Sequence, residues 1–232
     1  MFSIANCLTA SNLFFGCLGI VSLFRGDYQY TVVFSICAAL ADLLDGWIAR
    51  LLNQQSELGQ ELDSLADVVS FGVLPSCIAY QIMNGIDLDF GLPYIAFLLA
   101  VMAAFRLARF NLKASSKPSP YFQGVPVPMM GIFFTGFLSV YFQETTIPYF
   151  EFIVLASVLL FSFLMISHFP IVKLMINKNW MQDHWLLLLL CFLGACLYPF
   201  IGFLCLNVIV LLWILYSFFQ NKNRNHEISS KN

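Results

Sequence analysis

The chain has 232 residues, of which 60% are hydrophobic and only 10% are charged, and its mean hydropathy is +0.81. A soluble globular domain carries about 25% charged residues, so the composition excludes that class and indicates a polytopic membrane protein. The formal net charge is only −2, and we expect no nucleic-acid partner. No Lys or Arg precedes Arg25, so the first apolar segment is expected to be a retained span rather than a cleaved signal peptide.

Apolar runs that can cross a bilayer as helices need about 17–25 residues. Candidate runs lie at 8–24, 29–52, 60–82, 93–112, 125–142, 148–167, 185–199 and 201–219. The last two are separated near Tyr198, Pro199 and Gly202, because one helix through both would be too long for a bilayer of about 30 Å. The sequence therefore predicts an all-α fold with about eight transmembrane helices. Residues 1–219 are expected to form a single transmembrane domain, and residues 220–232 a polar cytoplasmic tail.

Positive charge gathers on one side of this topology. With eight spans and a cytoplasmic N-terminus, every Lys and Arg except Arg25 lies at or near the cytoplasmic side. The opposite loops carry Asp27, Asp87, Asp89 and Glu144. Cytoplasmic loops of membrane proteins are enriched in Lys and Arg. We therefore expect a multi-pass protein of the cell membrane with both termini in the cytoplasm.

Four aspartates occur within apolar segments at the spacing D-x2-D-G-x2-A-R-x8-G-x3-D-x3-D. They are Asp42, Asp45, Asp63 and Asp67. An ionised side chain at membrane depth costs about 2.5–3.5 kcal/mol, so these carboxylates must have something to hold. Spacings of three and four residues put each pair on one face of its helix, and a short connection would turn the pairs toward each other. Oxygen ligands favour Mg²⁺, Mn²⁺ or Ca²⁺ over Zn²⁺, so the pattern predicts a site for one or two divalent cations.

The residues between the aspartates suit a phosphate ligand. Gly46, Ala49 and Gly59 leave room for a helix or a ligand to approach the backbone. Arg50 lies eight residues after Asp42, on roughly the same face, where its guanidinium can bind a phosphate. Two other interpretations stay open: acids that pair with arginines to stabilise the bundle, and acids that line a proton or cation path in a transporter.

The spaced string from Asp42 to Asp67 resembles the full signature of CDP-alcohol phosphotransferases, with all eight defining positions present. The resemblance implies an integral membrane enzyme, with a six-helix catalytic core and commonly homodimeric, that transfers a phosphatidyl group from CDP-diacylglycerol or a related donor to an alcohol. It implies a divalent cation, Mg²⁺ or Mn²⁺, bound by Asp42, Asp45 and Asp63. It also implies that Asp67 lies near the metal and is the general base. The CDP pocket would be lined by Gly46, Ala49, Arg50 and Gly59.

Three further strings resemble the bacterial and archaeal branch of this family that uses L-serine as the acceptor. They are D-S-L-A-D-V-V-S-F-G-V-L-P-S from Asp63 to Ser76, R-L-A-R-F-N from Arg106 to Asn111, and F-Q-G-V-P-V-P from Phe122 to Pro128. The opening pattern of that branch is also matched, and adds Thr9 and Asn12 to the implied CDP pocket. The resemblance therefore implies CDP-diacylglycerol and L-serine as substrates, with phosphatidylserine and CMP as products.

The acceptor pocket is expected at Arg106, Arg109, Ser70 and Asn111. Serine brings a carboxylate, which an arginine can bind, and the hydroxyl and amide can bond its other polar groups. Alternatively, the arginines anchor the helix by snorkelling, and the hydroxyl and amide only satisfy helix ends. The basic residues Arg106, Arg109 and Lys113 also leave a phosphorylated acceptor open, such as glycerol 3-phosphate or inositol phosphate. A cation transporter is the alternative outside enzymes.

Overall fold

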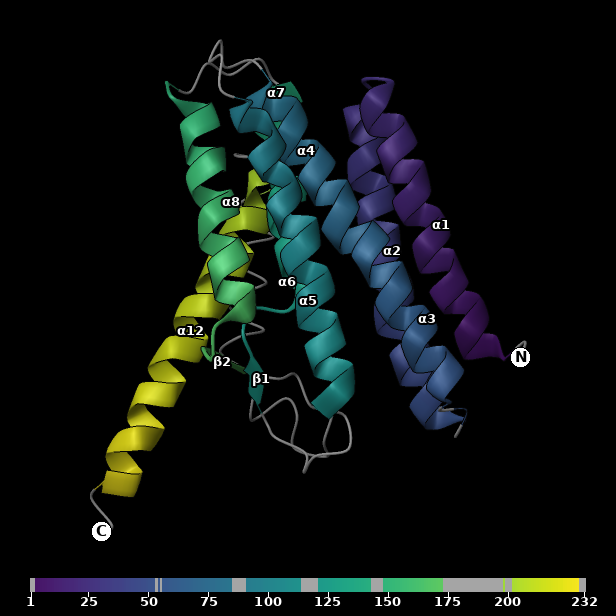
Figure 1. Cartoon of the computed structure of the whole chain (residues 1–232), viewed down its shortest axis with the longest axis vertical. Coiled ribbons are helices and arrows are strands. Elements are labelled where there is room, and N and C mark those ends of the chain that lie inside the picture. The colour runs from purple at the N-terminus through teal and green to yellow at the C-terminus, as the bar shows by residue number, and fades with distance from the viewer. Residues whose placement is uncertain are drawn as a thin grey trace.

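The computed structural model describes residues 3–52, 54, 56–84, 91–113, 121–142, 148–172, 198 and 202–229. These residues form helices, apart from one short two-stranded sheet (Figure 1). The first half contains α1 (Ile4–Phe24), α2 (Tyr28–Leu51), α3 (Glu57–Asp67), the π-helix η1 (Val68–Val73), α4 (Leu74–Met83), the 3-10 helix η2 (Leu92–Phe97) and α5 (Leu98–Lys113). The second half contains β1 (Tyr121–Gln123), α6 (Val127–Gly136), α7 (Leu138–Phe142), α8 (Phe150–Ile166), β2 (Pro170–Val172) and α12 (Leu204–Ser229).

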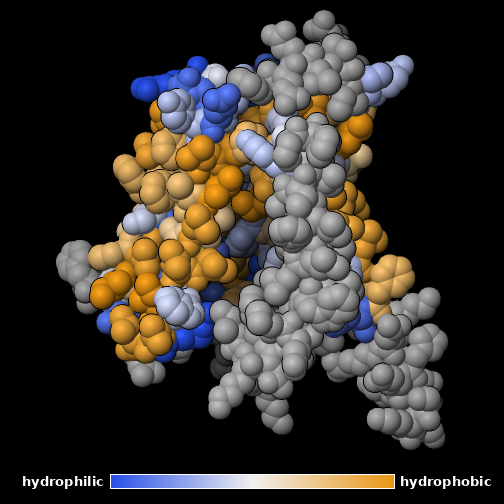
Figure 2. Space-filling model, turned by 180° about the vertical axis from the view of Figure 1, so that it is seen from behind, coloured by the Kyte–Doolittle hydropathy of each residue, from blue (hydrophilic) through white to orange (hydrophobic). Residues whose placement is uncertain are grey.

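Four of the described helical segments are long and apolar enough to cross a membrane. They are Ile4–Phe24, Tyr28–Leu51, Glu57–Met83 and Leu92–Leu112, and three shorter apolar helices follow at Val127–Tyr141, Phe150–Ile166 and Leu204–Gln220. Figure 2 shows the surface that they build, a broad apolar band with hydrophilic residues gathered toward its two ends. The all-helical prediction is confirmed for these residues. The expected span at 185–199 lies outside the described residues, apart from Tyr198.

Helices α1, α2 and the continuous segment from α3 to α4 run in alternating directions, and α12 ends toward the same end of the bundle at which α1 begins (Figure 1). The connection from α2 to α3, the sheet and the C-terminus of α8 also lie toward that end. The turn from α1 to α2 lies at the opposite end, where Gly26 takes a φ of +80°. The amides of Gly26 and Asp27 donate to the carbonyls of Leu23 and Ser22, which closes α1 and returns the chain along it.

The segment from α3 to α4 is one continuous helix that widens into a π-turn directly after Asp67. Pro75 explains the widening, because it has no amide hydrogen and its ring would clash with a carbonyl of the preceding turn. The amide of Leu74 donates instead to the carbonyl of Val69, five residues earlier. The widened turn is packed closely against α1 and α6. A Cβ atom at Gly16 would lie 2.9 Å from the Cα of Ser70, and one at Gly131 would lie 3.1 Å from the Cα of Phe71.

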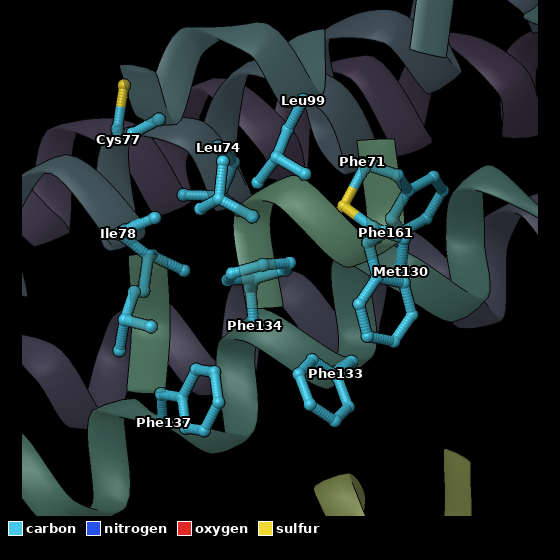
Figure 3. Close-up of a cluster of buried hydrophobic side chains, with 14 of the residues drawn as sticks. Phe71, Leu74, Cys77, Ile78, Leu99, Met130, Phe133, Phe134, Phe137 and Phe161 are labelled. Atoms are coloured by element: carbon cyan, nitrogen blue, oxygen red, sulfur yellow. The ribbon is translucent and has the colours of Figure 1, made fainter. Parts of the chain in front are cut away.

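Aromatic and aliphatic side chains from η1, α4, α5, α6 and α8 fill the interior beyond this turn (Figure 3). The rings of Phe133 and Phe161 are 4.5 Å apart between centroids, and Phe71 and Phe134 are fully buried. Lipid tails are as apolar as these side chains, so close van der Waals packing rather than water exclusion holds such helices together in a bilayer. The core fixes η1, and therefore fixes the position of Asp67 at its start.

Candidate metal and nucleotide site

Three carboxylates from two helices meet at the centre of the site. Asp42 comes from α2, and Asp63 and Asp67 from successive turns of α3. One oxygen atom of each lies within 4.8 Å of the others, and Asp67 is buried while the other two are half-buried. The expected facing of the two aspartate pairs therefore brings three of the four acids into one cluster.

Helix α1 supplies polar partners to two of the acids. The Thr9 hydroxyl donates to Oδ2 of Asp45 over 2.5 Å, and the Asn12 amide donates from Nδ2 to Oδ1 of Asp67 over 3.3 Å. Asp45 is buried and lies beside the three-carboxylate cluster without belonging to it. Thr9 and Asn12, which the opening pattern added to the implied CDP pocket, thus each donate a hydrogen bond to a signature carboxylate. Thr9 in addition lines the cavity described below.

The donor set fits a divalent cation. Oxygen ligands of an octahedral Mg²⁺ are about 2.9 Å apart when adjacent and about 4.1 Å apart when opposite. Three oxygens that lie within 4.8 Å of one another would therefore move closer together around a bound ion. Oδ1 of Asp63 is buried and has no hydrogen-bond partner among the described residues. A buried acceptor without a donor costs about 1–3 kcal/mol, and a cation between these carboxylates would remove that cost and their mutual repulsion.

A cavity of about 300 Å³ opens beside the carboxylates, between α1, α2 and the start of α3. Asp45 and Asp63 form part of its wall, next to the cluster. The rest of the wall includes all four small or basic residues of the spaced signature, Gly46, Ala49, Arg50 and Gly59. The cavity therefore joins an acidic end, which suits a metal, to a wall with a guanidinium, which suits phosphate.

Two glycines shape this cavity. A Cβ at Gly46 would lie 3.6 Å from an Nη atom of Arg50. The side chain of Arg50 therefore runs back along α2 and covers Gly46, which lies one turn earlier in the same helix. A Cβ at Gly59 would lie 3.0 Å from Oδ1 of Asn6, so the missing side chain lets the start of α3 approach α1. Ser56 caps that helix by accepting from the Gly59 amide over 3.0 Å.

Arg106 lies on the other side of the carboxylates, in α5. Its side chain is only 7% exposed, and its Nε atom is buried without a hydrogen-bond partner among the described residues. The guanidinium interacts electrostatically with the carboxylate of Asp67. A guanidinium presents its donors in a planar fork, so this arginine can still bind an anionic group that comes to lie beside Asp67.

The other three residues of the expected acceptor pocket make contacts within the protein. Arg109 donates from Nη1 to the carbonyl of Ile166 at the end of α8 over 2.8 Å. Asn111 bonds three side chains of α3, which are Gln60, Glu61 and Ser64. Ser70 is fully buried in η1 and donates to the carbonyl of Asn12 over 3.0 Å.

Comparison with known proteins places this geometry in a family. The model of the CDP-alcohol phosphatidyltransferases matches residues 2–169, which include every helix that lines the site. The chain belongs to this family. In this chain, the acids of the spaced signature are the three clustered carboxylates and Asp45. The glycines of the signature are Gly46 and Gly59, which shape the cavity.

Similar curated proteins are named CDP-diacylglycerol–serine O-phosphatidyltransferases. The protein of Helicobacter pylori (strain ATCC 700392 / 26695) is 37% identical over 129 residues, or 55% of this chain and 53% of its own length. That of Bacillus subtilis (strain 168) is also 37% identical over 129 residues, or 54% of this chain and 69% of its own length. The protein of Mycobacterium tuberculosis (strain CDC 1551 / Oshkosh) is 29% identical over 216 residues, or 86% of this chain and 70% of its own. The chain thus matches only about half the length of the Helicobacter protein.

Several cavity residues were not singled out as site residues from the sequence. They are Ala5, Asn6, Gln54, Ser56 and Gln60. Asn6 and Gln60 could have been found from helical spacing, because each lies three residues before a site residue, Thr9 or Asp63, on the same helix face. Gln54 lies in the connection between α2 and α3, where no periodic pattern indicates the direction of a side chain.

Proposed function

We propose that the protein transfers the phosphatidyl group from CDP-diacylglycerol to L-serine, giving phosphatidylserine and CMP in phospholipid biosynthesis. The family of the chain and the names of the similar proteins support this reaction. The observation that carries the proposal is that the carboxylate cluster lies between two different surroundings. Asp63 lines the signature cavity together with Arg50, and Asp67 interacts electrostatically with the buried guanidinium of Arg106.

These surroundings suit the two substrates. The diphosphate of the donor would lie along the cavity wall, with Arg50 bound to phosphate oxygens and the acyl chains left in the lipid. The carboxylate of serine would bind Arg106, which brings its hydroxyl toward Asp67. Arg109, the next cation on α5, donates to the carbonyl of Ile166, so one buried guanidinium, that of Arg106, would remain for the acceptor. That arrangement suits one carboxylate better than a dianionic phosphate.

Asp67 would take the proton of the serine hydroxyl as the oxygen attacks phosphorus. The new bond joins that oxygen to the phosphorus next to diacylglycerol, and the bond from the same phosphorus to the CMP oxygen breaks. The hydrogen bond from Asn12 occupies Oδ1 of Asp67, which leaves Oδ2 to accept the proton. A carboxylate is a weak base for an alcohol, so proton transfer must be concerted with attack.

Asp42, Asp63 and Asp67 would hold a divalent cation, Mg²⁺ or Mn²⁺, with Asp45 as the fourth acid of the set. When bound, such an ion neutralises charge on the diphosphate and on the departing CMP. Thr9 holds Asp45 in a fixed orientation through its hydrogen bond, and so keeps this carboxylate in the wall of the cavity.

We further propose eight spans around a six-helix catalytic core, with the site and both termini on the cytoplasmic side. Two described positions support this count, because β2 lies toward the site end of the bundle whereas Gly202 lies near Tyr28 at the opposite end. Residues 1–219 would form the catalytic domain, and the protein would work as a homodimer in the cell membrane.

An acceptor panel on the purified protein tests the reaction. The protein is supplied with CDP-diacylglycerol, Mg²⁺ or Mn²⁺, and one acceptor at a time, and lipid product and CMP are measured together. L-Serine should give phosphatidylserine with an equal amount of CMP, while glycerol 3-phosphate and inositol phosphate give little of either. A preference for glycerol 3-phosphate would overturn the serine assignment and leave only the broader phosphotransferase reaction. The absence of CMP with every acceptor would overturn the enzyme assignment.

A further inference from the structure

The last turn of α5 is tied to α3 on one side. Oδ1 of Asn111 accepts from Gln60, and its Nδ2 donates to Ser64 over 3.0 Å and to Glu61 over 3.4 Å. Ser64 follows Asp63 directly in the chain. The amide of Asn111 therefore links the end of α5 to the turn of α3 that carries a clustered carboxylate.

The same turn is tied to α8 on the other side. Arg109 donates to the carbonyl of Ile166 over 2.8 Å, one of the carbonyls that a helix end leaves without an internal partner. The loop after β1 satisfies one more, since the amide of Val125 donates to the carbonyl of Leu164 over 3.3 Å. The amide of Gly124 donates to the carbonyl of Phe169, just beyond the end of α8, over 2.8 Å. The pairing of β1 with β2 extends this contact.

Gly124 is the residue that allows the loop to approach α8 so closely. It takes a φ of +78°, and a Cβ atom there would lie 2.4 Å from the carbonyl oxygen of Met165 and 2.9 Å from that of Leu164. Gly26 takes a nearly identical φ of +80° with nothing within 4 Å of such a Cβ. Substitution of either glycine by alanine therefore strains a left-handed backbone, but only the substitution at Gly124 also disturbs the contact with α8.

We propose that the end of α5 is a brace, in which Asn111, Arg109 and Gly124 are positioning residues that set the place of Arg106 relative to Asp67. Arg106 lies one helical turn before the braced turn. The contact to α3 fixes the separation from the acidic cluster, and the contact to α8 stops α5 from rotating away. The role of Arg106 in holding the acceptor rests on the proposed function, whereas the brace itself rests on these contacts.

The brace gives α8 and the 121–125 loop a part in acceptor alignment although neither lines the cavity. Orientation of the acceptor hydroxyl decides the rate of transfer, and a displacement of about 1 Å can cost about 100-fold. The cavity proposed for the donor lies between α1, α2 and α3, and no residue of α5 lines it, so a loosened α5 should impair use of the acceptor more than binding of the donor.

Gly124→Ala and Gly26→Ala, measured side by side with the acceptor that the panel selects, test the brace. Gly124→Ala should lower kcat/KM for the acceptor by about 10- to 100-fold while changing the KM for CDP-diacylglycerol by less than about twofold. Gly26→Ala should keep both values near those of the wild type. Equal effects of the two variants, or an equal loss for donor and acceptor in Gly124→Ala, would overturn the proposal.

Arg109→Met and Arg109→Lys are a second pair of variants that test the brace if Gly124→Ala does not fold. Both keep a long side chain, and only lysine can still donate to the Ile166 carbonyl. Lysine should therefore preserve the acceptor KM, while methionine raises it. A raised acceptor KM in Arg109→Lys would instead indicate a forked contact with the acceptor and would overturn the positioning role.

Spin labels give a readout that does not depend on the reaction. On a background without the native cysteines, labels at Leu112 on α5 and Phe163 on α8 occupy exposed sites, 84% and 73% exposed in the native protein. Their distance distribution should be narrow in the wild type, Gly26→Ala and Arg109→Lys, and broad in Gly124→Ala and Arg109→Met. Unchanged distributions in the last two would overturn the brace. If no acceptor reacts, the proposed function fails while these distances still decide the brace.

Discussion

Asn12 on α1 donates a hydrogen bond to Oδ1 of Asp67 on α3, 55 residues along the chain. Asn12 is fully buried. Its backbone carbonyl accepts a hydrogen bond from the hydroxyl of Ser70, which lies one turn after Asp67. Helix α1 therefore holds both the carboxylate and the π-turn that follows it. This contact gives a residue outside the spaced aspartates a direct part in orienting the proposed base.

Asn12→Ala should lower kcat by about 10- to 100-fold, the effect of losing a hydrogen bond to a charged group, about 1.5–3 kcal/mol. The KM for CDP-diacylglycerol should change little, since the amide contacts Asp67 rather than the cavity. The control is Ser11→Ala, which removes an exposed hydroxyl at the preceding position of the same helix. A raised donor KM with normal kcat would mean that Asn12 contacts the nucleotide instead.

Asp67→Asn should nearly abolish turnover while the protein stays folded, because the substitution removes the base and keeps the size of the side chain. Loss of a general base costs about 10²–10⁴-fold, and loss of a cation ligand should add to this. Initial rates of CMP release and the melting temperature in detergent are the measurements. Glu57→Gln, which removes an exposed carboxylate from the first turn of α3, should leave both unchanged. Near-normal turnover in Asp67→Asn would show that the base lies elsewhere.

Removal of divalent cations should stop the reaction and also lower the melting temperature, because a ligand that binds only the folded state stabilises it by about 2.7 kcal/mol at 100 times its Kd. Mg²⁺ or Mn²⁺ should restore both. Asp63→Asn should lose the stabilisation by cation, yet be no less stable than the wild type in the absence of cations, because it removes one of three mutually repelling carboxylates. An undiminished cation-dependent rise in melting temperature in Asp63→Asn would remove this residue from the metal site.

Arg106→Lys should raise the KM for L-serine more than the KM for CDP-diacylglycerol. The substitution keeps the positive charge but loses the planar fork that binds a carboxylate at two points. Steady-state rates with each substrate varied in turn give the two constants, and Arg109→Lys is the matched control on the same helix. Normal serine dependence in Arg106→Lys would make this arginine an anchor and place the acceptor pocket elsewhere.

The distribution of positive charge predicts the sidedness of the loops. On a background without native cysteines, a reporter cysteine at Lys117 or Lys222 should react with an impermeant reagent only from the cytoplasm. A reporter at Asp87 or Glu144 should react only from the opposite side. Labelling of Lys222 and Asp87 from the same side would contradict eight spans.

The sequence by itself determined the features that depend on neighbouring residues, namely the helices and the helix faces that carry the aspartates. Apolar runs of membrane length indicated the helices, because a spanning segment must satisfy its own backbone hydrogen bonds. The three- and four-residue spacings put each aspartate pair on one helix face. The spaced signature joined them to the glycines and the arginine that line the cavity, so the family was already indicated by local pattern.

Only the tertiary structure decided how those faces meet. The spacing of the sequence does not distinguish Asp42 from Asp45. The rotation of α2 against α3 brings Asp42 into the cluster, whereas Asp45 accepts a hydrogen bond from Thr9. Arg106 and Arg109 are equally basic in the sequence. The packing of α5 buries Arg106, which interacts electrostatically with Asp67, and leaves Arg109 to donate to a carbonyl of α8. Such choices depend on how helices far apart in the chain pack together, as α5 does against Gly72 of η1, where a Cβ would lie 3.3 Å from that of Ala103. Local periodicity does not encode these contacts.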